Sequence, residues 1–265
     1  MESPLSIGCC AGEADLAVLQ RLPGLDFVEL PVTRALMSDA AAFEQLAGRF
    51  VGGRLAARAA NVFLPADLRV VGPEASLDRL CEYTVTALDR ARRLGVEVLV
   101  FGSGRSRSVP AGFAHERALD QFESAVRAVH EEASARGVTL AIEPLHAEET
   151  NLLTSVAEAA AFIRDRDLAG VRLTADLWHM RCADEDLSAL AGASDLVAHA
   201  HVAAAERWAP GQAPDEIVDF LGRLRAAGYG GRCSIECRWT DLAAEVGGAV
   251  ARVRAAATTA GWSAA

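Results

Sequence analysis

The chain has 265 residues, of which 51% are hydrophobic, and it carries a formal net charge of −10 at pH 7. Because a negative surface repels phosphate backbones, this charge argues against a nucleic-acid partner. No apolar stretch approaches the ~20 residues that a transmembrane helix needs, so we expect neither membrane insertion nor a membrane partner.

Apolar runs of strand length recur eight times along the chain, and helical stretches separate them. The strand-like runs lie at residues 5–8, 27–30, 59–63, 96–101, 138–142, 171–175, 197–202 and 233–235. The helical stretches, rich in alanine, leucine, arginine and glutamate, lie at residues 14–21, 41–46, 76–94, 115–136, 155–166, 215–227 and 241–259. Gly95, Gly137, Gly170 and Gly231 come shortly before strands, where a left-handed residue ends the preceding helix. This pattern indicates a repeated βα unit.

Eight βα units in a chain of this length predict a closed (β/α)8 TIM barrel that forms a single domain over residues 1–265. An open doubly wound sheet fits less well, since such sheets usually have fewer strands and a glycine-rich phosphate turn after the first one. Residues 102–113 and 201–214 are longer loops that follow strands, on the face of a barrel where its chemistry takes place.

The N-terminal residues M-E-S-P-L-S-I-G contain neither the basic region nor the long apolar region of a signal peptide. We therefore expect a cytoplasmic protein. Its six cysteines include no C-x-x-C pair, so we expect free thiols rather than disulfides or a zinc-thiolate site.

Four polar residues end the last four apolar runs: Glu143, Asp176, His201 and Glu236. The carboxyl ends of neighbouring barrel strands meet at one rim, so these side chains are expected to converge. Buried carboxylates repel one another unless a cation compensates their charge. Three carboxylates and one imidazole suit Mn²⁺, Mg²⁺ or Co²⁺, with Zn²⁺ as a further option. Taken singly, each residue has another interpretation, as a salt-bridge partner or a hydrogen-bonded core residue.

Other polar residues nearby leave two interpretations open. Arg105 and Arg107, in G-S-G-R-S-R-S, either bind an anion or belong to a solvated loop. His146 is interpreted as a loop residue that need only be solvated, and it is left outside the ligand set. His199 lies two residues before His201 and shares its face of the strand, which predicts a packed, hydrogen-bonded histidine one layer deeper in the barrel.

At these residues the chain resembles the xylose isomerase-like TIM barrels, specifically the sugar phosphate isomerase/epimerase group that includes the ketose 3-epimerases. The resemblance covers most of the chain, from N-V-F-L-P at residues 61–65 through V-F-G-S at residues 100–103 to the last strand. In that family a Glu, an Asp, a His and a Glu at four successive strand ends hold one divalent metal ion. The resemblance implies this role for Glu143, Asp176, His201 and Glu236.

The resemblance also implies substrate contacts. The family places a second Glu six residues after the first ligand, a His in D-x-x-H, and an Arg six residues after the ligand His. These positions correspond to Glu149, His179 and Arg207, and A-P-G follows at residues 209–211 as in the family. One departure is Ala204, where family members often carry Asp, Glu or Asn. Because a contact to substrate or to a neighbouring side chain is lost there, Ala204 affects which substrate we expect more than which type of reaction.

The function that the resemblance implies is that of a metal-dependent isomerase or epimerase of a small ketose or polyhydroxy ketone, acting through an enediolate. Glu143 and Glu236, on opposite sides of the substrate, would act as base and acid. The partner would be a small sugar-derived molecule, and the cofactor a single divalent metal ion. A homo-oligomer is compatible with the sequence.

Three alternatives stay open at this stage. An inosose-type dehydratase or a hydroxypyruvate isomerase would use related enolate chemistry on the same barrel. An AP endonuclease-like DNA-repair enzyme would need additional histidines at the ends of strands three and four, where residues 61–63 and 102–103 contain none, and the net charge also opposes it. A non-catalytic binding protein is the third, and the intact set of site residues argues against it.

Overall fold

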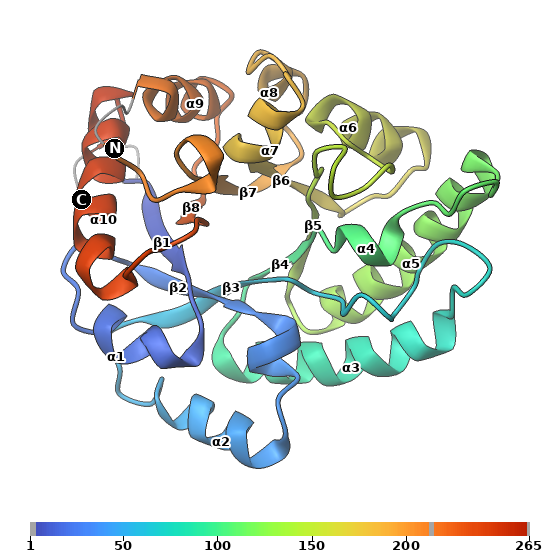
Figure 1. Ribbon diagram of the computed structural model, residues 1–265, viewed down its shortest axis with the longest axis horizontal. Helices are drawn as coiled ribbons and strands as arrows, with labels where there is room; N and C mark the ends of the chain where they lie inside the picture. Colours follow the sequence, from blue (N-terminus) through green and yellow to red (C-terminus); the bar gives the residue numbers. More distant parts are fainter. Residues whose placement is uncertain (1–3, 212–214, 264–265) are drawn as a thin grey trace.

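The computed structural model describes residues 4–211 and 215–263, and it confirms the barrel that the sequence predicts. Eight parallel strands close into a ring in the order of the chain, with the last strand pairing with the first (Figure 1). The strands are β1 (Ser6–Cys10), β2 (Phe27–Pro31), β3 (Ala56–Asn61), β4 (Val98–Phe101), β5 (Thr139–Ile142), β6 (Arg172–Asp176), β7 (Val197–Val202) and β8 (Arg232–Ile235).

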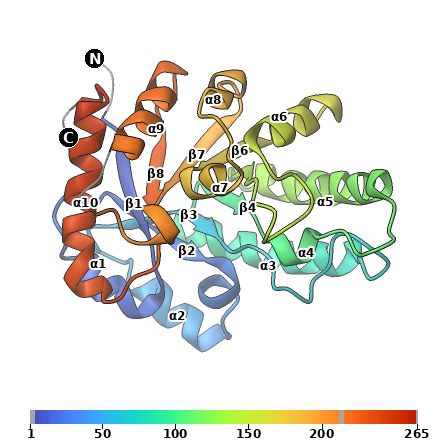
Figure 2. The same cartoon turned by 45° about the horizontal axis from the view of Figure 1, so that its top comes forward.

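Helices surround the strands, and Figure 2 shows α3, α5 and α6 lying outside β4 to β6. The α-helices are α1 (Leu16–Leu19), α2 (Ala40–Gly48), α3 (Leu77–Leu94), α4 (Gly104–Arg107), α5 (His115–Ala135), α6 (Val156–Asp165), α7 (Leu177–Cys182), α8 (Ala189–Gly192), α9 (Asp215–Ala226) and α10 (Leu242–Thr259). Three short helical turns complete them: η1 (Glu13–Asp15), η2 (Val32–Leu36) and η3 (Ala205–Arg207). None of the helices described combines the length and the hydropathy that a membrane span needs.

The starts of three long helices differ from the sequence prediction by one residue, for a common reason. Ser76, Ser155 and Asp241 were expected as first helical residues, but each is an N-cap in extended conformation. Its side-chain oxygen accepts a hydrogen bond from a backbone N–H three residues further on, which satisfies a donor that the helix itself leaves free.

The expected loops after β4 and β7 contain short helices that the sequence analysis missed. Helix α4 lies inside residues 102–113, and η3 lies inside residues 201–214, of which 212–214 fall outside the described residues. Both helices are shorter than two turns, so they lack the periodicity by which a helix is recognised. The prediction for Gly231 was wrong: Gly95, Gly137 and Gly170 have positive φ as expected, but after α9 that conformation falls on Gly228.

The barrel interior is layered, with an apolar layer below a polar one. Because alternate strand residues point to the same face, Phe27 and Glu29 both point inward from β2, and His199 and His201 both point inward from β7. The Phe27 ring occupies the space where a side chain at Gly8 would lie, 2.3 Å from a Cβ built there. All of these side chains are buried. A buried polar layer of this kind needs internal partners.

Strand register brings the predicted ligands to the same rim. Asp176 lies directly opposite His201 in the pairing of β6 with β7. Val202 lies opposite Ile235 in the pairing of β7 with β8, so Glu236 follows one residue beyond this pair. Glu143 likewise follows Ile142, the last residue of β5.

Candidate metal centre and substrate pocket

Four side chains converge at the carboxyl ends of β5 to β8. The Nδ1 atom of His201 lies 2.9 Å from Oε1 of Glu143, 3.2 Å from Oε2 of Glu236 and 3.5 Å from Oδ2 of Asp176. One ligand atom from each of the four residues lies within 4.8 Å of the others. The structure therefore brings together the whole set that the sequence predicted as metal ligands.

The carboxylate of Asp176 is oriented by the helix that begins after it. Asp176 is the last residue of β6 and the N-cap of α7, and its Oδ1 accepts a hydrogen bond of 3.0 Å from the backbone N–H of His179. This leaves Oδ2 facing His201. The spacing D-x-x-H is thus also the spacing of a helix N-cap to its third residue.

Glu143 is positioned by the neighbouring strand β4 and the loop after it. Its backbone oxygen accepts a 2.7 Å hydrogen bond from Nη2 of Arg107, which is fully buried. Its Oε2 lies 2.4 Å from where a Cβ at Gly102 would be, so a side chain at that position would displace the carboxylate. Arg107 is therefore a structural residue, and both interpretations of it, as an anion-binding group and as a solvated loop residue, are wrong.

Glu236 has hydrogen-bond donors on both carboxylate oxygens. Asn61, at the end of β3, donates from Nδ2 to Oε1 at 2.9 Å, and Arg207 donates from Nη2 to Oε2 at 2.7 Å. Arg207 also contacts Glu149, with 3.3 Å between Nη1 and Oε1. Glu149 and Arg207, both predicted to contact substrate, are thus linked by ion pairs to Glu236, a predicted metal ligand. The part that Asn61 plays was missed in the sequence.

Beneath the four predicted ligands lies Glu29, a residue that the sequence analysis did not single out. It is fully buried, and its two oxygens contact two imidazoles: Oε2 lies 2.7 Å from Nε2 of His199, and Oε1 lies 3.0 Å from Nε2 of His201. Since an ionised carboxylate only accepts hydrogen bonds, Nε2 of His201 carries a proton. A neutral His201 must then present the lone pair of Nδ1 to the three carboxylates. The sequence does contain a sign that Glu29 is buried, namely a carboxylate inside the apolar run F-V-E-L.

Charges in this cluster are strongly interdependent. Burial opposes a charge on His201, but the surrounding carboxylates, Glu29 and Glu236 foremost, raise the pKa of its imidazole well above the usual value. Burial raises the pKa of Glu143. Burial also acts on Asp176 and Glu236, yet nearby imidazoles outweigh it and lower the pKa of both carboxyls. The cluster therefore requires positive charge at its centre.

The donor set fits a divalent metal ion. Three carboxylate oxygens and one imidazole nitrogen, all from buried or half-buried side chains, match the hard or borderline ligands that Mn²⁺, Mg²⁺, Co²⁺ or Zn²⁺ accepts. A cation would supply the charge that protonated His201 otherwise provides. A second group of suitable spacing, Cys10 with Glu29 and His201, fits less well, because burial raises the pKa of Cys10 and keeps it a thiol.

His179 faces the pocket with a defined donor. Its Nδ1 accepts a 3.3 Å hydrogen bond from the backbone N–H of His146 and lies 2.8 Å from Nδ1 of the same residue. In the neutral form its proton therefore sits on Nε2, which is buried and has no partner among the described residues. The stacked ring of His146 is itself buried. His146 is a loop residue outside the set of Glu143, Asp176, His201 and Glu236, as predicted, but the interpretation that it is merely solvated was wrong.

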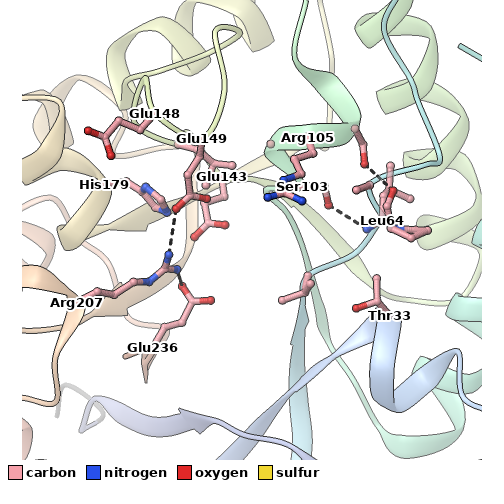
Figure 3. Close-up of a pocket in the computed structure, with 16 residues that line it drawn as sticks. Thr33, Leu64, Ser103, Arg105, Glu143, Glu148, Glu149, His179, Arg207 and Glu236 are labelled. Carbon is pink, nitrogen blue, oxygen red and sulfur yellow. Dashed lines mark hydrogen bonds and ion pairs between the residues drawn. The ribbon is translucent and has the colours of Figure 1, made fainter. Parts of the chain in front are cut away.

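These groups line a pocket of about 580 Å³ above the strand ends. Figure 3 shows Glu143, His179, Arg207 and Glu236 on one wall, with Arg105 reaching in from α4 across from them. The lining also includes apolar groups from the loop after β3. The volume is within the range typical of small-molecule sites.

Comparisons with known proteins agree with this architecture. A family model described as xylose isomerase-like TIM barrel matches residues 16–262. The 3-dehydro-D-guloside 4-epimerase of Escherichia coli (strain K12) is 26% identical over 176 residues, which cover 61% of this chain and 67% of that protein. The L-ribulose 3-epimerase of Mesorhizobium japonicum is 29% identical over 123 residues, which cover 46% of this chain and 41% of that protein.

Solved structures share the fold at lower identity. The apo 3-keto-D-glucoside 4-epimerase from Escherichia coli superimposes with a TM-score of 0.81 at 19% identity, covering 95% of this chain and 99% of that one. The D-psicose 3-epimerase from Clostridium cellulolyticum H10, solved with D-tagatose, also gives a TM-score of 0.81, at 18% identity, covering 96% and 99%. At these identities the likeness is one of fold.

Proposed function

The chain belongs to the xylose isomerase-like TIM-barrel family, as its motifs indicated, and we propose that it is a metal-dependent epimerase or isomerase of a small ketose or related polyhydroxy ketone. The observation that carries this proposal is the convergence of Glu143, Asp176, His201 and Glu236 on one point at the rim of a sugar-sized pocket. The sequence relatives named as sugar epimerases support it.

In this proposal the same four residues hold one divalent metal ion, with Nδ1 as the ligand atom of His201. When bound, the ion supplies a Lewis acid that polarises a substrate carbonyl and its neighbouring hydroxyl. Glu29 keeps the imidazole in the required tautomer by accepting a hydrogen bond from its Nε2–H.

Glu143 and Glu236 are the proposed proton-transfer residues. They come from β5 and β8 and approach the pocket from different strands, so one can remove a proton from carbon on one face while the other delivers a proton to the opposite face. Such a two-sided transfer inverts the configuration of the carbon, which is epimerisation. Transfer by one carboxylate along a single face would give isomerisation instead.

His179 and Arg207 are proposed to bind substrate oxygens. His179 lines the pocket and its Nε2–H has no partner among the described residues, and the guanidinium of Arg207 lies between Glu149 and Glu236. Removal of a proton beside a carbonyl leaves negative charge on oxygen, as in an enediolate, and both groups can donate hydrogen bonds to it. Arg207 cannot act as a ligand, because its guanidinium stays protonated.

The test is a screen of the metal-loaded protein with ketoses, ketose phosphates and inososes in D₂O, followed by NMR. We expect a product with deuterium at the carbon next to the carbonyl, and a large fall in kcat for Glu143→Gln and Glu236→Gln. Metal content is measured for each variant, since loss of the ion would also lower the rate. Product without deuterium would refute proton transfer and favour a hydride shift. Loss of water would identify the dehydratase alternative.

A further inference from the structure

The pocket is divided into two walls of different charge (Figure 3). One wall contains all the lining carboxylates, together with His179 and Arg207. These carboxylates are Glu143, Glu148, Glu149 and Glu236. The opposite wall is formed by the loops after β2, β3 and β4, and its lining residues include Thr33, Leu64, Ser103 and Arg105 but no carboxylate. Positive charge on that wall is therefore uncompensated.

Arg105 differs from the other arginines of the site in having no partner. Arg207 forms ion pairs with two glutamates, and Arg107 is buried with its guanidinium bonded to backbone carbonyls. Arg105 is exposed, and among residues 4–211 and 215–263 it has neither a hydrogen bond nor an ion pair from its side chain. Its charge is free to bind a ligand in the pocket.

The backbone that carries Arg105 is firmly held even though its guanidinium is free. The hydroxyl of Ser103 accepts a 2.9 Å hydrogen bond from the backbone N–H of Leu64. The hydroxyl of Ser106 donates at 3.0 Å to the backbone oxygen of Pro65. These bonds tie both ends of the short helix α4 to the loop after β3, so the side chain starts from a fixed point on the pocket wall.

An anionic group is the ligand that this arrangement selects. A guanidinium presents paired N–H donors that match a carboxylate or a phosphate, and such charged hydrogen bonds are stronger than neutral ones. The carboxylates of the opposite wall would repel the same anion, and Arg207 on that wall is already paired with two of them, which favours a position near Arg105. A substrate with one anionic end would thus be oriented with its other end at the metal centre.

Resting on the proposed function, we infer that the substrate is a ketose or polyhydroxy ketone with a carboxylate or a phosphate ester at the end remote from the reacting carbon, and that Arg105 binds this group. Contact at a remote, unreactive group supplies binding energy that positions the reacting carbon between Glu143 and Glu236. Neutral sugars of the same skeleton would lack this orientation.

The experiment compares three sugars that differ only at C6: D-fructose, D-fructose 6-phosphate and D-fructuronate. Their dissociation constants are measured by calorimetry with the metal-loaded wild type and with Arg105→Ala and Arg105→Lys. Arg92→Ala is the matched control, because Arg92 is an exposed arginine near the end of α3 and does not line the pocket. Turnover of each sugar is followed in parallel by deuterium uptake.

We expect at least one anionic sugar to bind the wild type more tightly than D-fructose does. Arg105→Ala should weaken that binding by roughly 10- to 100-fold, the usual range for a hydrogen bond to a charged group, while Arg105→Lys retains part of it and Arg92→Ala changes nothing. The preferred anion tells whether the group is a carboxylate or a phosphate. D-Fructose should bind equally to all four proteins.

Two results would overturn this inference. The first is a wild type that binds neither anionic sugar more tightly than D-fructose. The second is an Arg105→Ala variant that weakens all three sugars equally, which would make Arg105 a hydroxyl contact. Deuterium uptake separates this inference from the proposed function: an anion preference without exchange refutes only the function, and exchange without a preference refutes only the role of Arg105.

Discussion

Glu29→Gln tests whether the buried carboxylate beneath the site prepares His201 for the metal ion proposed there. The substitution keeps the shape of the side chain and removes its charge. In the wild type each carboxylate oxygen accepts from one imidazole, at 2.7 Å from His199 and 3.0 Å from His201. A glutamine has only one acceptor oxygen, and its amide N–H₂ would face the N–H of one of the two imidazoles.

The expected effect follows from this mismatch. One imidazole must turn or shift its proton, and for His201 a proton on Nδ1 would block the lone pair that faces Glu143, Asp176 and Glu236. Loss of a partner that orients a metal-bound histidine typically weakens metal binding by about 10- to 100-fold. In free energy this is about 1.4–2.8 kcal/mol.

The assay is a competition titration of Mn²⁺ against a chelator, with wild type, Glu29→Gln and the control Glu131→Gln, an exposed glutamate on α5. Circular dichroism of the metal-free proteins shows whether the barrel is retained. Wild-type metal affinity in a folded Glu29→Gln protein would refute the argument that Glu29 sets the tautomer of His201. Weaker binding in the Glu131→Gln control would show that the effect is not specific to the site.

Three further predictions concern the same site. Because the raised pKa of His201 keeps it protonated at neutral pH without metal, binding of a metal ion should release about one proton and weaken about tenfold per pH unit as the pH falls; calorimetry in buffers of different ionisation enthalpy would detect it. His146→Ala should keep metal affinity but lower kcat, since His179 loses the partner that faces its Nδ1; an unchanged kcat would contradict this role. Gly102→Ala should weaken metal binding by displacing Glu143, because the added Cβ would lie 2.4 Å from Oε2, and an unaltered affinity would show that the carboxylate moves without loss.

The sequence alone determined the barrel and the four residues that converge at its rim. Each strand is a short apolar run, and Glu143, Asp176, His201 and Glu236 stand at or beside the ends of four consecutive runs, so their convergence follows from local pattern and the geometry of parallel strands. Their role as metal ligands stays a prediction. The ends of the long helices could also be predicted from the local sequence. Three of these helices begin one residue later than predicted, because the serine or aspartate expected as the first helical residue is the N-cap.

Only the tertiary structure decided which other side chains support these residues. The contact of Glu29 with His201 joins residues 172 positions apart, and that of His146 with His179 joins residues 33 apart. No periodicity in a sequence specifies such pairs. Arg105 and Arg107 share one loop motif and one residue type, yet the turn of α4 buries Arg107 against the backbone of Glu143 and directs Arg105 into the pocket. The two side chains differ in role because their Cα–Cβ bonds point in different directions in the folded loop. A guanidinium surrounded by carbonyls is structural, whereas one without such acceptors is available to a ligand.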